Sequence, residues 1–66
     1  MKFAERLKDL RLERGLSAKA LGKEIGVSDA TIIRWENVTM IPRADYVVII
    51  AKYFKVSSDY LLGLED

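Results

Sequence analysis

The sequence contains no cysteine and no histidine, and this absence removes several kinds of chemistry at once. Without thiols and imidazoles the chain has no disulfide, no cysteine nucleophile, no histidine general base and none of the ligands of a zinc finger. The remaining hydroxyls and carboxylates form no catalytic constellation in the sequence. We therefore expect a protein that is not an enzyme and that needs no metal or cofactor.

The chain also lacks a strong charge bias and a long apolar run. Its 11 basic and 10 acidic residues leave a net charge of +1, which is low for a protein that binds nucleic acid. Any basic surface must come from the way these charges are distributed. No apolar stretch approaches the ~18 residues of a membrane span, and no signal-peptide core follows the first residue. These features predict a cytoplasmic protein without a membrane segment.

What the chain does contain is apolar residues at helical spacing. Half of its 66 residues are hydrophobic, which suits the core of one small domain over residues 1–66. In five segments these residues recur three and four positions apart, so each segment would form a helix with one buried stripe. The expected helices cover residues 2–14, 17–25, 29–36, 44–54 and 58–62. The sequence thus predicts an all-α fold.

The second and third of these segments organise the rest of the chain. Leu21 and Ile25 lie one turn apart on one face, and Ile32 and Trp35 share a face of the following helix. Gly26 falls between the two stripes, where the chain must leave the first helix with a positive φ. This is the spacing of a helix-turn-helix. Because Trp35 shares the apolar stripe of Ile32, we expect it in the core and not as a platform on which bases stack.

Small residues mark the ends and the crossing point of the expected helices. Gly22 removes a side chain where the two helices of the helix-turn-helix must approach closely. Gly15 and Gly63 follow the last turns of two other helices and are expected to end them. Serines occupy positions where a side-chain oxygen can accept from the backbone of the first turn. These expected N-caps are Ser17, Ser28 and Ser57.

The fourth segment is rich in aliphatic residues. Its expected buried stripe consists of Val47, Ile50, Ala51 and Phe54. Val48 and Ile49 are expected to widen this stripe, which would make the helix central in the core.

The residues that fill the helix-turn-helix spacing resemble the lambda-repressor/Cro (XRE-type) family of phage and bacterial regulators. The matching positions are Ser17, Leu21, Gly26-Val27-Ser28, Thr31-Ile32 and Arg34-Trp35-Glu36-Asn37. The resemblance continues through residues 3–16 and 50–63, so it covers essentially the whole chain. It implies a compact five-helix lambda-repressor-like DNA-binding domain with the helix-turn-helix at helices 2 and 3.

The resemblance further implies that the third helix reads bases in the major groove of a double-stranded DNA operator. The candidate base readers on its outward face are Asp29, Ala30, Ile33 and Arg34. Arg34 can donate two hydrogen bonds to guanine, and Ala30 and Ile33 offer methyl surface to thymine. Asp29 could accept from cytosine, or it could be an ordinary first-turn acid favoured by the helix dipole. Simple surface exposure is the alternative for Arg34, and for Ile33 the alternative is an exposed or partner-facing apolar residue.

Phosphate contacts are expected around the starts of the second and third helices, whose free amides also suit an anion. The candidates are Ser17, Lys19, Lys23, Ser28, Thr31, Asn37 and Arg43. Thr31 could instead pack inward, and plain solvation is the alternative for the others.

The family pattern also implies a structural ion pair and a homodimer. Arg11 and Glu36 stand where family members often join the first helix to the end of the third, the alternative being two separate solvated charges. Family members generally pair through the last helix or the loop before the fourth. The candidate interface residues are Met40, Ile41, Tyr60, Leu61 and Leu64. Burial in the core of the monomer is the alternative for this set.

Taken together, these features predict a sequence-specific transcriptional regulator, most simply a repressor, that reads a palindromic operator and uses no small-molecule substrate. The rival hypothesis is a protein-interaction module, an antitoxin-like or anti-repressor partner that keeps the fold with weak DNA binding. Ala18 replaces the family's usual glutamine, and Val38 replaces its usual glycine. The uncharged loop over residues 38–42 and the near-neutral charge also favour this rival.

Overall fold

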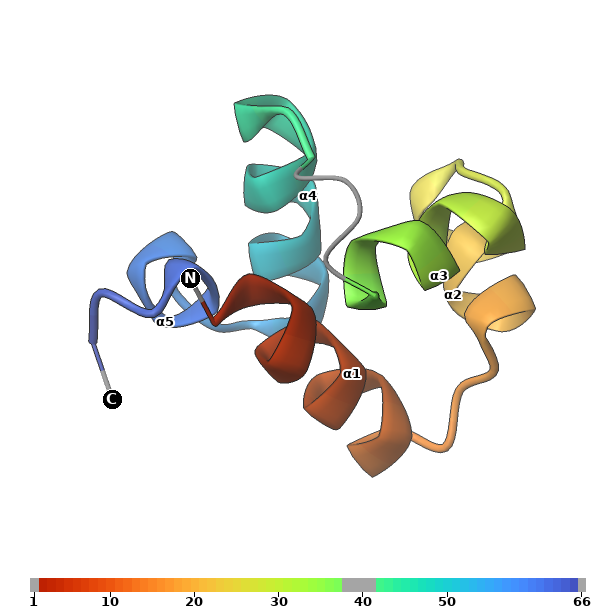
Figure 1. The fold of residues 1–66 in the computed structure, drawn as a ribbon, viewed down its shortest axis with the longest axis horizontal. Helices are drawn as coiled ribbons and strands as arrows, with labels where there is room; N and C mark the ends of the chain where they lie inside the picture. Colours follow the sequence, from red (N-terminus) through yellow and green to blue (C-terminus); the bar gives the residue numbers. More distant parts are fainter. Residues whose placement is uncertain (1, 38–41, 66) are drawn as a thin grey trace.

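A computed structural model describes residues 2–37 and 42–65, which form helices without any strand (Figure 1). The helices are α1 (Phe3–Glu13), α2 (Ala18–Ile25), α3 (Asp29–Glu36), α4 (Ala44–Phe54) and α5 (Ser58–Leu62). The all-α prediction is confirmed, and α3, α4 and α5 have the predicted bounds. Within these described ranges no helix combines the length and the apolarity that crossing a membrane would need.

The first two helices are shorter than predicted because their expected end residues are caps. Ser17 has extended backbone angles, with φ −75° and ψ 163°, and therefore lies just outside α2. Lys2 and Arg14 are the residues that flank α1, and neither of them has extended backbone angles. The three predicted serine caps are confirmed, since each Oγ accepts from the backbone N–H three residues later at 2.9 to 3.2 Å. Each such cap contributes about 1 kcal/mol to helix stability.

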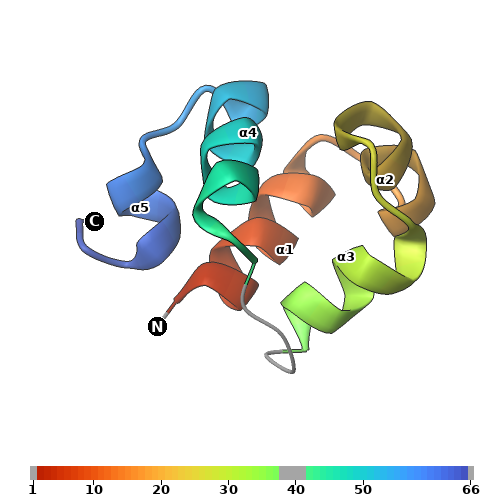
Figure 2. The same ribbon diagram turned by 90° about the horizontal axis from the view of Figure 1, so that it is seen from above.

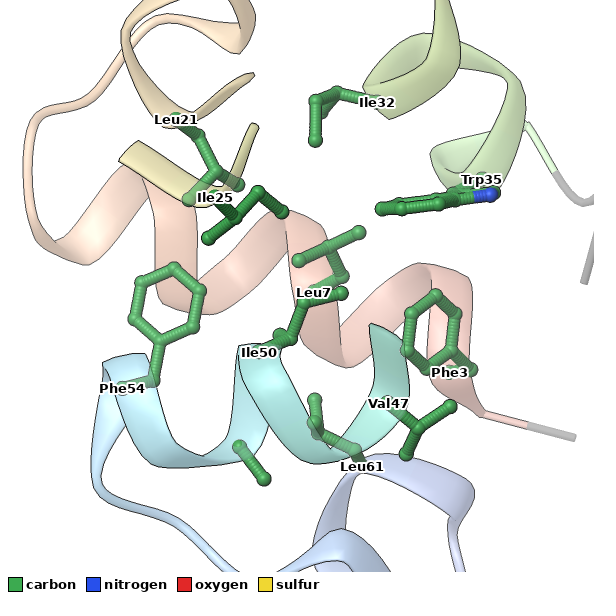
Figure 3. Close-up of a cluster of buried hydrophobic side chains, with 11 residues drawn as sticks. Phe3, Leu7, Leu21, Ile25, Ile32, Trp35, Val47, Ile50, Phe54 and Leu61 are labelled. Atoms are coloured by element: carbon green, nitrogen blue, oxygen red, sulfur yellow. The ribbon is translucent and has the colours of Figure 1, made fainter. Parts of the chain in front are cut away.

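All five helices contribute to one hydrophobic core, whose side chains point toward one another in Figure 3. Trp35 is almost fully buried, as predicted, and its ring meets Phe3 edge-on at a centroid distance of 6.4 Å. The rest of the cluster consists of Leu7, Leu21, Ile25, Ile32, Val47, Ile50, Ala51, Phe54 and Leu61. This core fixes the orientation of α3 because Trp35 and Ile32 are the inward residues of that helix.

The helix-turn-helix lies at one end of the molecule and α5 at the other, with α1 and α4 between them (Figures 1 and 2). Gly22 makes the sharp turn between α2 and α3 possible, because an added Cβ at this position would lie 2.5 Å from the carbonyl oxygen of Val27. The carbonyl of Gly22 also accepts from the amides of Gly26 and Val27, at 2.8 and 2.9 Å. The expected close approach therefore exists, and the turn backbone is what comes close. Gly26 has the predicted positive φ of 82°.

The buried face of α4 is narrower than predicted. Val48 and Ile49 are 43% and 41% exposed, so the expectation that they widen the buried stripe is wrong. By helical geometry the two residues stand about 110° and 150° away from the centre of that stripe. The neighbouring helices cover only the opposite side of α4, and an apolar strip is left in solvent.

Candidate nucleic-acid interface

The outward face of α3 carries all four residues predicted to read bases. Asp29, Ala30, Ile33 and Arg34 are exposed, and Ile33 leaves 47% of its surface in solvent. On the opposite face, Ile32 and Trp35 are locked into the core. The helix is therefore held by one face and presents the other, which is the arrangement that a groove-reading helix requires.

The start of α3 is already occupied by its own side chains. Ser28 Oγ accepts from the amide of Thr31 at 3.2 Å, and Asp29 Oδ1 accepts from the amide of Ala30 at 2.8 Å. Ser28 Oγ also lies 3.0 Å from the hydroxyl oxygen of Thr31. Because the Asp29 carboxylate adds negative charge at this end, the start of α3 suits a phosphate less well than the sequence analysis expects.

The start of α2 is better suited to an anion. Its first turn contains no acidic residue, and the exposed Lys19 lies in that turn. Lys23 is exposed in the last turn of the same helix. Two lysines and the positive end of the helix dipole can therefore act together on phosphates beside α3.

The other candidate phosphate contacts differ in how accessible they are. Ser17, Ser28 and Asn37 are exposed, whereas Thr31 is half-buried and its hydroxyl contacts the cap of α3. Arg43 is exposed, and its guanidinium lies 3.3 Å from a carboxylate oxygen of Asp45. A surface pair of this kind is worth little, so it does not prevent Arg43 from reaching a phosphate.

The predicted ion pair between α1 and α3 is present. Arg11 Nε and Nη2 donate to the two carboxylate oxygens of Glu36 at 2.7 and 2.9 Å, and Nη1 donates to the carbonyl of Leu16 at 2.8 Å. The hydrogen bond to Glu36 raises the pKa of Arg11 above its ordinary value, although burial acts in the opposite direction. The pair fixes the end of α3 against α1, and orientation is its main contribution because desolvation offsets much of the Coulombic gain.

The described residues predicted for a dimer interface, Tyr60, Leu61 and Leu64, do not form one exposed surface. Leu61 is fully buried, so its assignment to the interface is wrong; the single turn of α5 directs it into the core. Leu64 is exposed, and Tyr60 is half-buried under the guanidinium of Arg6, 4.2 Å from the ring centroid. Two further candidates lie outside the described residues, Met40 and Ile41.

Two contacts that position these surfaces are not predicted from the sequence. Arg6 donates from Nη1 to the carbonyl of Tyr60 at 2.6 Å, which ties α1 to α5. Arg14 lies 5.3 Å from the ring centroid of Phe54 and so covers the end of α4. Both contacts join residues far apart in the chain, and the only local hint is the position of each arginine beside the apolar stripe of α1.

The geometry described above, an exposed α3 held by a buried stripe and packed against a capped α2, agrees with comparison to known sequences. A sequence model described as helix-turn-helix matches residues 7–61. The chain belongs to the XRE-type helix-turn-helix family. This explains why the matching residues extend beyond the two central helices into α1, α4 and α5.

Relatives of this helix-turn-helix protein include regulators from two bacteria. The HTH-type regulator YobD of Bacillus subtilis is 34% identical over 64 residues, covering 97% of this chain and 57% of the relative. The activator BcrR of Enterococcus faecalis is 33% identical over 66 residues, covering all of this chain and 32% of the relative. The chain therefore spans between a third and somewhat over half of the length of these regulators.

A solved structure shares the same arrangement of helices. The crystal structure of the P22 c2 repressor protein in complex with a synthetic operator aligns with a TM-score of 0.84 and 32% sequence identity. The alignment covers 89% of each chain. The five-helix lambda-repressor-like fold is thereby confirmed.

Proposed function

We propose that this helix-turn-helix protein is a sequence-specific transcriptional regulator, acting as a repressor, that binds a palindromic double-stranded operator as a homodimer. The observation that carries the proposal is the outward face of α3. Its candidate base readers stand in solvent, while Ile32, Trp35 and the Arg11–Glu36 pair hold the helix from behind. A related repressor of the same fold has been solved on its operator.

In this proposal α3 enters the major groove and α2 crosses the phosphate backbone beside it. Arg34 donates two hydrogen bonds to guanine O6 and N7, and Ala30 and Ile33 contact thymine methyl groups. The Asp29 carboxylate is poised to accept from cytosine N4, while its negative charge keeps phosphates away from the start of α3. Sequence is therefore read by four neighbouring side chains on one face.

Binding strength comes from phosphate contacts, and α2 supplies the strongest of them. Lys19 and Lys23 stand on the helix whose first turn carries no acid, and Ser17 lies at its start. The net charge is only +1, so these contacts depend on how the charges are distributed and not on their total. Because each phosphate contact releases counterions, we expect log K to fall steeply with log salt concentration. We further propose that the protein acts in the cytoplasm and that it binds its operator without a cofactor or a small-molecule substrate.

Selection of bound DNA from a pool of random duplexes tests the proposal directly. We expect enrichment of a palindrome whose half-site centres lie about one helical turn, ~10 bp, apart. The affinity of the protein for the selected duplex should then fall as the salt concentration is raised, and the logarithm of the binding constant K should fall linearly with the logarithm of the salt concentration. Enrichment of no sequence, together with no salt-dependent binding to any duplex, would contradict the proposal.

The second candidate is a protein-interaction module, and the exposed apolar side chains Ile33, Val48 and Ile49 favour it. Such a module would bind a protein through these residues and bind DNA weakly. The same selection separates the two functions, because only the regulator enriches a defined sequence. Repression and activation separate in a reporter assay with the selected operator placed over or upstream of a promoter.

A further inference from the structure

One face of α4 is left uncovered by the rest of the described chain. Asp45, Val48, Ile49 and Lys52 are all exposed, and the spacing of these four residues puts them on one stripe. This stripe, called here the α4 face, lies opposite the side of the helix that enters the core. In Figure 1 the N-terminal turns of α4 rise above the neighbouring helices. The face is therefore open to a partner.

The α4 face has a symmetry that points to a particular partner. Asp45 precedes Val48 by three residues, and Lys52 follows Ile49 by three residues, so the acid and the base are equidistant from the midpoint of the apolar pair. A two-fold axis through this midpoint would place a second α4 antiparallel to the first. Each Asp45 would then face Lys52 of the second copy, and each Val48 would face Ile49. A surface that complements itself in this way is what an isologous dimer requires.

We propose that two copies of this chain pair through their α4 faces in an antiparallel arrangement. The role of this pairing in reading a palindrome rests on the proposed function. The pairing itself can be measured without DNA. The pairing does not depend on Leu61, because this side chain is buried in the core of its own chain. Arg43 contacts Asp45 in an exposed surface pair, which leaves the carboxylate accessible to a second copy.

The size of the α4 face predicts how the pairing behaves. Two aliphatic side chains and two charges from each copy make a much smaller contact than a permanent interface. The free protein should therefore dimerise weakly. Two copies bound to adjacent half-sites have a high effective concentration for each other, so pairing should be nearly complete on a palindrome.

Disulfide trapping tests the arrangement, because the chain has no cysteine of its own. Asp45→Cys and Lys52→Cys variants are oxidised separately and as a mixture, with no DNA present. In the proposed pair, position 45 meets position 52 of the other copy, and the mixed product also keeps one intact Asp45–Lys52 pair. The two thiols of paired Asp45→Cys chains would stand about 10 Å apart along the helices, too far for a disulfide. We expect the mixed disulfide to exceed both self-linked products about tenfold. Equal or statistical yields would overturn the proposal.

Charge reversal tests the same contact without a covalent bond. Asp45→Lys and Lys52→Asp each create like-charged pairs across the two-fold axis, and the double variant restores opposite charges. Sedimentation should show dimerisation weakened about tenfold in each single variant and returned to within about twofold in the double variant. Circular dichroism checks that every variant is folded. A double variant no better than either single variant, in folded protein, would overturn the proposal.

A matched apolar pair of variants separates this inference from the proposed function. Ile49→Glu alters the α4 face, whereas Leu12→Glu alters an exposed leucine on α1. Ile49→Glu should abolish dimerisation and reduce binding to a palindrome while leaving binding to a single half-site unchanged. Leu12→Glu should change none of the three. Normal dimerisation of Ile49→Glu would overturn the proposed pairing, whatever the result for DNA binding. Failure of the wild-type protein to bind any duplex would count against the proposed function alone.

Discussion

Two outward helix faces of this molecule carry the same ingredients in the same order. The face of α3 begins with Asp29 in its first turn and ends with Arg34 in its last, and two apolar residues lie between them. The α4 face begins with Asp45 and ends with Lys52, again around two apolar residues. On residue types alone the two faces would be assigned the same role.

Their neighbours separate the two faces. The end of α3 is tied to α1 through Glu36 and Arg11, and α2, which carries two exposed lysines, packs against α3. The spacing of the charges does not distinguish the faces, because Asp29 and Arg34 are also equidistant from the midpoint of their apolar pair. A single helix face therefore does not define a binding site; what lies beside it and how firmly it is held decide whether it suits DNA or another protein.

The largest expected effect comes from removing the support of α3. In Glu36→Ala, the partly buried guanidinium of Arg11 loses both carboxylate hydrogen bonds, which should lower the free energy of unfolding by about 3 kcal/mol. The control Asp45→Ala removes an exposed pair on α4 and should cost less than about 1 kcal/mol. Urea denaturation measures both variants. Equal losses would show that α3 is held no more firmly than α4.

A second substitution tests the turn that sets α3 against α2. In Gly22→Ala the new Cβ would lie 2.5 Å from a backbone carbonyl oxygen, so the turn must move. We expect a loss of about 2 kcal/mol in stability, because overpacking outweighs the gain in helix propensity. Gly15→Ala is the control for lost backbone freedom alone, since its φ is positive but no atom lies within 4 Å of the added Cβ. A thermal melt in which Gly22→Ala is the milder variant would contradict the steric argument.

The sequence predicts the features of the fold that depend on neighbouring residues, and it does not predict those that depend on contacts between distant residues. The serine caps, the turn at Gly26 and the bounds of α3 to α5 were predictable because each depends on a few consecutive residues. The exposure of Val48 and the burial of Leu61 were mispredicted because each depends on which other helix lies opposite. Arg6 was missed because its acceptor on α5 is 54 residues away.

The candidate site likewise has features that the local sequence predicts and features that it does not. Helical spacing predicted correctly that the four candidate base readers would be exposed, because the direction of a side chain on a regular helix is a local property. The ion pair of Arg11 with Glu36 came from the family pattern, since nothing local to either residue identifies its partner. Base and phosphate contacts stay predictions, because they depend on a DNA surface outside the chain.

Arg34→Ala is expected to weaken binding to DNA in a way that depends on the base sequence. Loss of a bidentate contact to guanine should weaken operator binding by about 1–3 kcal/mol and relax the preference at one base position. Lys52→Ala, which removes the corresponding base from the α4 face, should leave binding to a half-site unchanged. Titration against the selected half-site and its single-base variants measures both effects. Uniform weakening of all sequences by Arg34→Ala would mean that Arg34 contacts phosphate.

The smallest expected effect concerns the lysines that distinguish the surroundings of α3 from those of α4. Lys19→Ala should weaken binding to every duplex by a similar factor and reduce the slope of log K against log salt by about 1, because one phosphate contact and its released counterion are lost. Lys55→Ala, at the far end of α4, is the matched control and should leave the slope unchanged. An unchanged slope in Lys19→Ala would remove Lys19 from the phosphate contacts and leave Lys23 as the candidate lysine on α2.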